Sequence, residues 1–388
     1  MTAPNDLGIE ISRRAAQIGA EVAGPVADEV DRSARFPSEA IEALRDGSLL
    51  SVLIPTESKE PPATLGKVSE AVFELGRHCA STAMIYAMHQ IQVACIVRHG
   101  RSELFREYLA DVSDRQLLLA SATTEAGVGG DVRTSVCTVE PAGAGRIRLE
   151  KQSPVISYGQ YADAVLATAR RSPDSPPNDQ VLVLCRPPGL TLEATSGWDT
   201  LGFRGTCSLG FRLVAEGEEG LALSDPYAEI LSQTMLPVSH ILWSSVWLGL
   251  ATAATDRARS FVRAEARKKP GVTPPAALRL AELMAQLQRM QEIVHGTAQR
   301  YDRECNDPDV LAGMGFAIAM NSLKVSSSTL VVDIVNRAMA ICGMAGYRED
   351  SPLSLGRILR DAHGAAVMVN NDRIYGNTAQ MLLIHRED

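Results

Sequence analysis

The run LLLASATTE, residues 117–125, marks the point at which the hydrophobic pattern of this 388-residue chain changes. Before it, apolar residues such as Ile11, Ala15 and Ile18 recur every three or four positions, which is typical of amphipathic helices. From it onward, short runs alternate in period two and are separated by Gly, Pro, Ser and Asp. After Tyr227 the helical spacing returns and continues to the end. The pattern predicts the order helical, β, helical.

The three segments have different characters. The stretch 80–97 is apolar nearly all round, which predicts a buried helix. The middle runs have no helices between them, which favours an antiparallel β-domain and excludes a parallel doubly wound sheet. Beyond Tyr227, long helices joined by short connections predict an antiparallel bundle. We therefore expect an α+β, mainly helical protein with a helical domain over 1–114, a β-domain over 115–226 and a helical bundle over 227–388.

Composition narrows the function classes. With 38 basic and 46 acidic residues the net charge is −8, and no Lys/Arg run concentrates positive charge, so we expect no nucleic-acid partner. The seven scattered cysteines argue against a disulfide framework or a metal site. The N-terminus lacks a signal pattern, and no segment approaches the roughly 20 apolar residues of a membrane span. These features predict a cytoplasmic protein without a membrane partner.

Two local features are candidates for function. The stretch TEAGVGGD, residues 124–131, follows a predicted strand but lacks the spacing of a phosphate-binding loop, so a plain turn is the default interpretation. Its glycines would still let the backbone approach a ligand. His240 lies at the start of a long apolar helix, where a titratable ring is a functional candidate. A structural role is the default for His240 and for His89.

Four stretches, taken in order, resemble the acyl-CoA dehydrogenase family over nearly the whole chain. The second stretch resembles the family's Thr-Glu-Pro-Gly-x-Gly-Ser-Asp loop, with Ala126 in place of Pro and Gly130 in place of Ser. The four stretches are EVAGPVADEVDRSARFPSEAIEALRDGSLLSVLIP (21–55), ATTEAGVGGD (122–131), GFRGT (202–206) and CGMAGYREDSPLSLGRILRDA (342–362).

This resemblance implies a four-helix C-terminal bundle, FAD held between the last two domains, and a homotetramer or homodimer in which a neighbour completes the cofactor site. By position, Thr124 would hydrogen-bond the flavin ring, and Gly130 would lie where the loop faces the phosphates. Ser157 would keep a hydroxyl beside flavin N5, while Val155 replaces an aromatic wall. Arg267 would meet the FAD pyrophosphate, for which a guanidinium fork is suited.

The family's catalytic carboxylate has no counterpart. An acyl-CoA dehydrogenase removes a proton from the α-carbon with a carboxylate in a dry pocket. Counting without gaps puts Val369 at the usual Glu position, and a gapped match puts Gly376 there. The other position used in the family falls near Ser239 and His240. His240 therefore becomes the candidate catalytic base or hydrogen-bonding group.

Three functions follow from the resemblance. The first is an FAD-dependent dehydrogenase that introduces a double bond into an acyl thioester of coenzyme A or of a carrier protein and passes electrons to a protein partner. The second is a flavin-dependent monooxygenase of the same fold that uses oxygen, with Ser157, His89 and His240 near the flavin. The third is a non-catalytic partner subunit. We place dehydrogenation first because the thioester-side motifs are retained.

Overall fold

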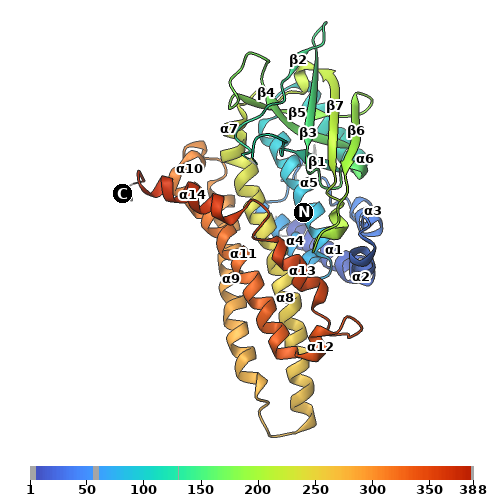
Figure 1. Ribbon diagram of the computed structural model, residues 1–388, viewed down its shortest axis with the longest axis vertical. Coiled ribbons are helices and arrows are strands. Elements are labelled where there is room, and N and C mark those ends of the chain that lie inside the picture. Colours follow the sequence, from blue (N-terminus) through green and yellow to red (C-terminus); the bar gives the residue numbers. More distant parts are fainter. Residues whose placement is uncertain (1–5, 56–60, 130, 386–388) are drawn as a thin grey trace.

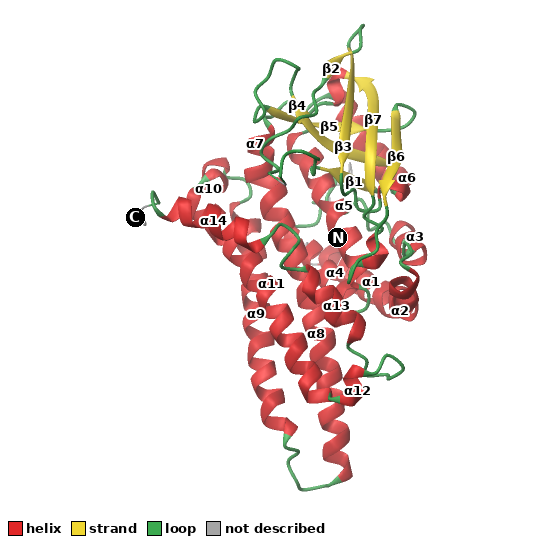
Figure 2. Ribbon diagram, viewed as in Figure 1, coloured by secondary structure: helices red, strands yellow, loops and turns green. Residues whose placement is uncertain are grey.

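The computed structural model describes residues 6–55, 61–129 and 131–385. Helices, strands and helices again follow one another along the chain, and the strands sit at one end of a long helical body (Figures 1 and 2). The mainly helical α+β fold expected from the sequence is confirmed.

The N-terminal helices pack around α5, which spans Ala80–His99. Nearly every residue of α5 is buried, as its uniformly apolar sequence predicts. The other helices of this segment are α1 (Asp6–Ile18), η1 (Gly19–Ala23), α2 (Gly24–Ser33), α3 (Ser38–Asp46), α4 (Leu65–Gly76) and α6 (Glu103–Arg115). Of these, α3, α4 and α6 contact α5.

The strands form two sheets, with the orders β1-β4-β5 and β2-β3-β7-β6. All pairs are antiparallel except β1 and β4, which run parallel with Leu119 opposite Ala164. The expectation of a purely antiparallel domain is wrong for this pair, because the chain passes through the other sheet between the two strands. The elements are β1 (Leu119–Ala122), β2 (Glu140–Pro141), β3 (Arg146–Ser153), η2 (Gly159–Tyr161), β4 (Ala164–Arg170), β5 (Gln180–Cys185), β6 (Leu190–Ser196), η3 (Arg204–Thr206), β7 (Gly210–Glu218) and η4 (Glu219–Leu221).

The C-terminal bundle is built on three long helices, α8 (Leu236–Lys268), α9 (Ala276–Glu304) and α11 (Met314–Cys342). Helix α4 packs against α8, and their backbones meet at Gly76 and Gly249. Helix α14 projects from the side of the body (Figure 1). The shorter elements are α7 (Tyr227–Ile230), η5 (Leu231–Met235), α10 (Pro308–Ala312), α12 (Met344–Tyr347), α13 (Gly356–Gly364) and α14 (Asn371–Leu382).

Three helical stretches reach the length and hydropathy of a membrane span, so the expectation that no segment approaches this length is wrong. The fold buries 89% of the most apolar window in Ala80–His99 and in Tyr227–Lys268, and 50% of that in Met314–Cys342. The first two are therefore accounted for as core helices.

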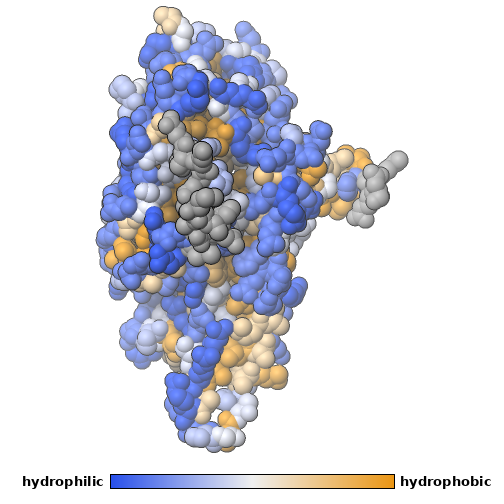
Figure 3. Space-filling model, turned by 180° about the vertical axis from the view of Figure 1, so that it is seen from behind, coloured by the Kyte–Doolittle hydropathy of each residue, from blue (hydrophilic) through white to orange (hydrophobic). Residues whose placement is uncertain are grey.

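Apolar surface is concentrated over the lower part of the bundle and on the projecting C-terminal segment (Figure 3). At that segment Tyr375, Leu382, Leu383 and Ile384 are all more than half exposed. Contiguous exposed apolar surface of this kind marks contact sites between proteins.

Candidate active site

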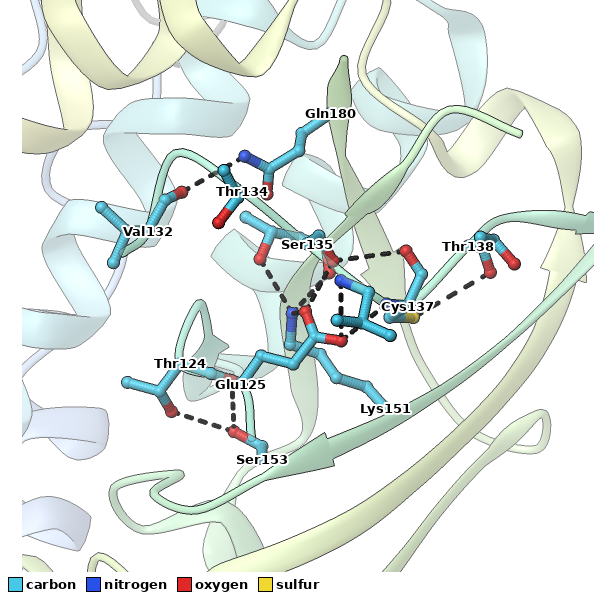
Figure 4. A network of polar contacts seen from close by, with 12 residues as sticks. Thr124, Glu125, Val132, Thr134, Ser135, Cys137, Thr138, Lys151, Ser153 and Gln180 are labelled. Carbon is cyan, nitrogen blue, oxygen red and sulfur yellow. Dashed lines mark hydrogen bonds and ion pairs between the residues drawn. The ribbon is translucent and has the colours of Figure 1, made fainter. Parts of the chain in front are cut away.

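A buried carboxylate closes the glycine-rich loop at its base (Figure 4). One oxygen of Glu125 accepts hydrogen bonds from Ser135 Oγ at 2.6 Å and Lys151 Nζ at 3.1 Å. The other oxygen accepts from the backbone N–H groups of Cys137 at 2.6 Å and Val136 at 3.2 Å. Glu125 therefore ties the first residues of the loop to residues 135–137.

The Glu125–Lys151 pair is charged although it is buried. Burial raises the pKa of Glu125, but the Lys151 charge and the hydrogen bonds from Ser135 and Cys137 outweigh it and hold the pKa below the ordinary 4.5. Lys151 Nζ also donates to the carbonyl and hydroxyl oxygens of Thr168 at 2.8 and 3.0 Å. Because its hydrogen bonds are satisfied, the pair is a stable anchor for the loop.

The glycine-rich loop has open space beside its glycines. Gly127 and Gly129 have φ values of +92° and +60°, which favour glycine, and a Cβ at either would meet nothing within 4 Å. Gly130, the other predicted loop residue, lies outside the described residues. Arg373 of α14 donates to the Gly129 carbonyl at 2.6 Å, so the bundle touches the loop.

The two ends of the loop reach two different cavities. At its start, Thr124 Oγ1 donates to the Val155 carbonyl at 2.8 Å and lies 3.1 Å from Ser153 Oγ. Near its end, Gln180 Nε2 donates to the Val132 carbonyl at 3.3 Å. Val155 lines an apolar pocket, and Gln180 lines a separate groove. The loop thus connects the walls of both.

The apolar pocket has a volume of about 430 Å³ and lies between α5, the β-domain and α13. Its walls are chiefly Met84, Met88, Val155, Phe203 and Met368. Such a surface favours a flat, largely apolar ligand over a charged one.

Three of the hydroxyls that line the apolar pocket form a chain. Ser208 Oγ donates to Ser157 Oγ at 2.8 Å and lies 2.7 Å from Thr206 Oγ1. Arg360 and His363 lie at the rim. Among the described residues that line this pocket there is no Asp or Glu.

The groove has a volume of about 360 Å³ and runs between the β-domain and the bundle. Arg133 and Gln180 give it a polar side, and Leu236, Phe316 and Met320 give it an apolar one. Gln180 is 2% exposed, and its Oε1 has no hydrogen-bond partner in the described part of the chain. A ligand N–H or O–H would satisfy this oxygen.

His240 lies behind the wall of the groove. Its Nδ1 bonds the Met320 carbonyl at 3.0 Å, and both Met320 and Leu236, one turn away on α8, line the groove. Burial lowers the pKa of His240 to about 4. The ring is therefore neutral at pH 7, donates through Nδ1 and keeps a lone pair on Nε2.

His89 has a structural role. Its Nε2 bonds the Leu50 carbonyl at 2.6 Å, and its Nδ1 accepts from the Leu119 N–H at 3.0 Å. Both ring nitrogens are used by the backbone, so His89 is not a candidate for ligand chemistry.

Val369, the ungapped position of the absent Glu, lies beside the apolar pocket in the α13–α14 loop, next to Met368. Lys324 Nζ donates to the Val369 carbonyl at 2.6 Å and to Asn371 Oδ1 at 2.7 Å, and burial lowers its pKa to about 8. Gly376, the gapped alternative, lies on α14 with nothing within 4 Å of a built Cβ. Which of the two positions corresponds to the family's Glu stays a prediction.

Arg267 is not brought to these cavities within one chain. It is exposed near the end of α8, roughly 40 Å along the helix from His240 at about 1.5 Å per residue. A role for Arg267 at the cofactor would require another subunit.

Comparison with known proteins assigns the family. The model of the acyl-CoA dehydrogenase N-terminal domain matches residues 9–116, and that of the acyl-CoA dehydrogenase C-terminal domain matches residues 230–369. The chain belongs to the acyl-CoA dehydrogenase family.

Similar family members include the mitochondrial short-chain specific acyl-CoA dehydrogenase of Bos taurus, 26% identical over 351 residues, which are 87% of this chain and 80% of the relative. The structure of butyryl-CoA dehydrogenase from Megasphaera elsdenii superposes with a TM-score of 0.83 at 19% identity, covering 97% and 98% of the two chains. The dibenzothiophene monooxygenase of Paenibacillus sp. A11-2 gives 0.80 at 20% identity, with the same coverage. These two structures establish the fold.

As a member of the acyl-CoA dehydrogenase family, the protein is an FAD-dependent flavoprotein oxidoreductase of the class that acts on CH–CH groups. The apolar pocket fits the flavin ring system, because its lining combines apolar walls with hydroxyl groups that can hydrogen-bond the ring. Of the two residues predicted to contact the flavin, Ser157 lines this pocket, and Thr124 does not line it but donates to the carbonyl of Val155. Their contacts with the cofactor stay predictions.

Sequence reasoning missed Glu125 with Lys151, Gln180, Ser208 and His363. The Glu125–Lys151 pair is 26 residues apart. Glu125 follows β1 of one sheet and Lys151 lies on β3 of the other, so only tertiary packing brings them together. Ser208 had no usable local signal, because Thr206 ends the 3-10 helix η3 and Cys207 has a φ of +45°, so the two hydroxyls meet through a turn.

Proposed function

We propose that the protein dehydrogenates an acyl thioester, with the flavin ring in the apolar pocket and the carrier arm in the groove. One observation carries this proposal: the glycine-rich loop joins the walls of both cavities, through Thr124 at one end and Gln180 near the other. A ligand with a reactive end at the ring and a long polar arm suits that arrangement. Anaerobic titration with thioesters of coenzyme A and of a carrier protein distinguishes the two possible arms.

FAD, when bound, supplies the acceptor for the hydride that leaves the β-carbon. The residues of the chain bind and orient the cofactor and the thioester. Met84, Met88 and Phe203 exclude water from the pocket, which strengthens every polar interaction inside it. The unpartnered Oε1 of Gln180 accepts an N–H from the amide-bearing arm of the thioester.

His240 is the proposed proton acceptor or hydrogen-bonding group. Its Nδ1–H is directed at the Met320 carbonyl, so Nε2 offers a lone pair at every pH above about 4. The His240→Ala variant is expected to retain its FAD but to lose at least about a hundredfold in turnover, the lower end of the range for a general base. Unchanged turnover would remove His240 from the mechanism.

A flavin-dependent monooxygenase is the second candidate, and a specific observation favours it. The described lining of the apolar pocket holds three linked hydroxyls and no carboxylate. The fold is also that of the dibenzothiophene monooxygenase. Reduced protein that consumes oxygen and incorporates it into a substrate would support this candidate. Reoxidation only by an electron-transfer protein would support the dehydrogenase.

We propose a homotetramer or homodimer as the working form. A second subunit would bury the exposed apolar residues of the C-terminal segment. Arg267, near the end of α8, would also need a second subunit in order to bind the pyrophosphate. If the protein copurifies with a Glu-bearing relative and is inactive alone, it is a partner subunit instead.

A further inference from the structure

We propose that the Thr206–Ser208–Ser157 hydroxyl chain reverses its direction with the redox state of the cofactor, so that Ser157 donates to the oxidised ring and accepts from the reduced ring. This proposal rests on the proposed placement of the flavin. It assigns Ser208 and Thr206 as positioning residues that act through Ser157.

The hydroxyl chain needs the proton of Ser157 to fill all three of its contacts. Thr206 Oγ1 donates to the Phe203 carbonyl at 2.8 Å, lies 2.7 Å from Ser208 Oγ, and Ser208 Oγ donates to Ser157 Oγ at 2.8 Å. Thr206 and Ser208 bring one proton each to these three contacts. All three are filled only if Ser157 turns its own proton back toward Ser208.

Two arrangements follow. In the first, Ser157 donates to Ser208, Ser208 to Thr206, and Thr206 to the Phe203 carbonyl, so that Ser157 shows lone pairs to the pocket. In the second, Thr206 donates to Ser208 and Ser208 to Ser157, so that the Ser157 proton points into the pocket.

The two arrangements are close in free energy because the Phe203 carbonyl does not depend on Thr206 Oγ1. The same oxygen accepts from the Thr206 backbone N–H at 3.0 Å and from Trp198 Nε1 at 3.1 Å. When the Thr206 hydroxyl turns away, no buried acceptor is left unsatisfied. Thr206 and Ser208 are 2% and 3% exposed, so bulk water does not replace either bond.

A reversible donor suits a flavin edge. The central ring nitrogen of oxidised flavin accepts a hydrogen bond, whereas two-electron reduction places a proton on it and makes it a donor. A fixed hydroxyl would leave one state with an unpaired buried group, which disfavours that state. A hydroxyl chain that can reverse its direction leaves no unpaired group in the oxidised or the reduced state.

The test compares Ser208→Ala with the wild-type protein loaded with FAD. Without Ser208, the Ser157 proton has no internal acceptor, so the reduced state loses more than the oxidised state. The dissociation constant of reduced FAD should rise about tenfold relative to that of oxidised FAD, which lowers the two-electron midpoint potential by about 30 mV. Ser208→Thr, which keeps the hydroxyl, should restore the wild-type potential.

A comparison of Thr206→Val with Thr206→Ser gives an independent test. The midpoint potential should fall by a smaller amount in Thr206→Val and should stay unchanged in Thr206→Ser. Ser327→Ala, which removes a buried hydroxyl of α11, is the control. FAD-loaded Ser208→Ala or Thr206→Val with unchanged potentials overturns the proposal, as does equal weakening of both redox states. Wild-type protein that binds no FAD would overturn the proposed function itself, which separates the two failures.

Discussion

At the scale of single residues, the buried Glu125–Lys151 pair sets the geometry of the glycine-rich loop. Glu125 accepts four hydrogen bonds from groups on two segments. Removing one partner of a buried pair leaves the other charge without compensation. The pair therefore fixes the position of the glycine-rich loop, and its loss should lower the stability of the whole β-domain.

Glu125→Gln is expected to lower the free energy of unfolding by about 3–5 kcal/mol, measured by chemical denaturation at pH 7. Because the pKa of Glu125 is held below 4.5, its contribution is complete above that pH and is lost as the pH falls through the lowered value. Glu216→Gln, in the exposed Arg146–Glu216 pair, is the control and should change stability by no more than about 1 kcal/mol. Equal effects of the two substitutions would contradict this account.

Lys324 gives a second pH-dependent prediction, in the alkaline range. Its pKa is lowered from 10.5 to about 8, so between these values the folded state binds fewer protons than the unfolded state. Stability from this group therefore rises as the pH increases from 8 to 10.5. Relative to Lys324→Met, the wild-type protein should gain about 2 kcal/mol over this range in denaturant titrations. Parallel pH profiles would show that Lys324 is not desolvated.

At the scale of elements, the close approach of α4 and α8 holds the N-terminal helices against the bundle. A Cβ on Gly249 would lie 2.6 Å from the Gly76 carbonyl carbon and 2.7 Å from the Phe73 carbonyl oxygen. Both neighbours are backbone, so they cannot turn aside. The helices would have to move apart.

Gly249→Ala is expected to lower stability by about 1–3 kcal/mol through overpacking. Gly296→Ala is the matched control, because a Cβ there meets nothing within 4 Å on exposed helix α9. It should raise stability by about 0.5–1 kcal/mol through helix propensity. A neutral Gly249→Ala measured by thermal denaturation would refute the tight crossing.

The elements were predictable to different degrees. The buried helix α5 and the long α8 followed from their apolar patterns. Strand β6 was missed because most of its side chains are exposed, so burial imposes little pattern. The parallel β1–β4 pair and the Thr206–Ser208–Ser157 chain depend on long-range packing, which a local pattern does not contain.

At the scale of the whole molecule, a complete cofactor site is expected to need two subunits. Arg267 lies near the end of α8 and is not among the residues that line either cavity. Arg267→Gln should weaken FAD binding, and Val155→Arg, which puts a charge into the pocket, should abolish it. When the two variants are co-expressed, the pocket of the first meets the Arg267 of the second, so partial FAD binding should return.

Flavin absorbance of the copurified mixed oligomer measures this recovery. Arg263→Gln, an exposed arginine on the same helix, is the control and should leave FAD binding unchanged. No recovery in the mixture, or a monomeric protein by light scattering, would place the whole site within one chain.

The most direct test of the central claim is an anaerobic titration of the FAD-loaded protein with a panel of acyl thioesters, on coenzyme A and on carrier protein, followed by flavin absorbance. The account predicts bleaching of the oxidised flavin band by at least one thioester, with much slower bleaching in His240→Ala. A flavin band that no thioester bleaches would contradict the claim that this protein dehydrogenates an acyl thioester.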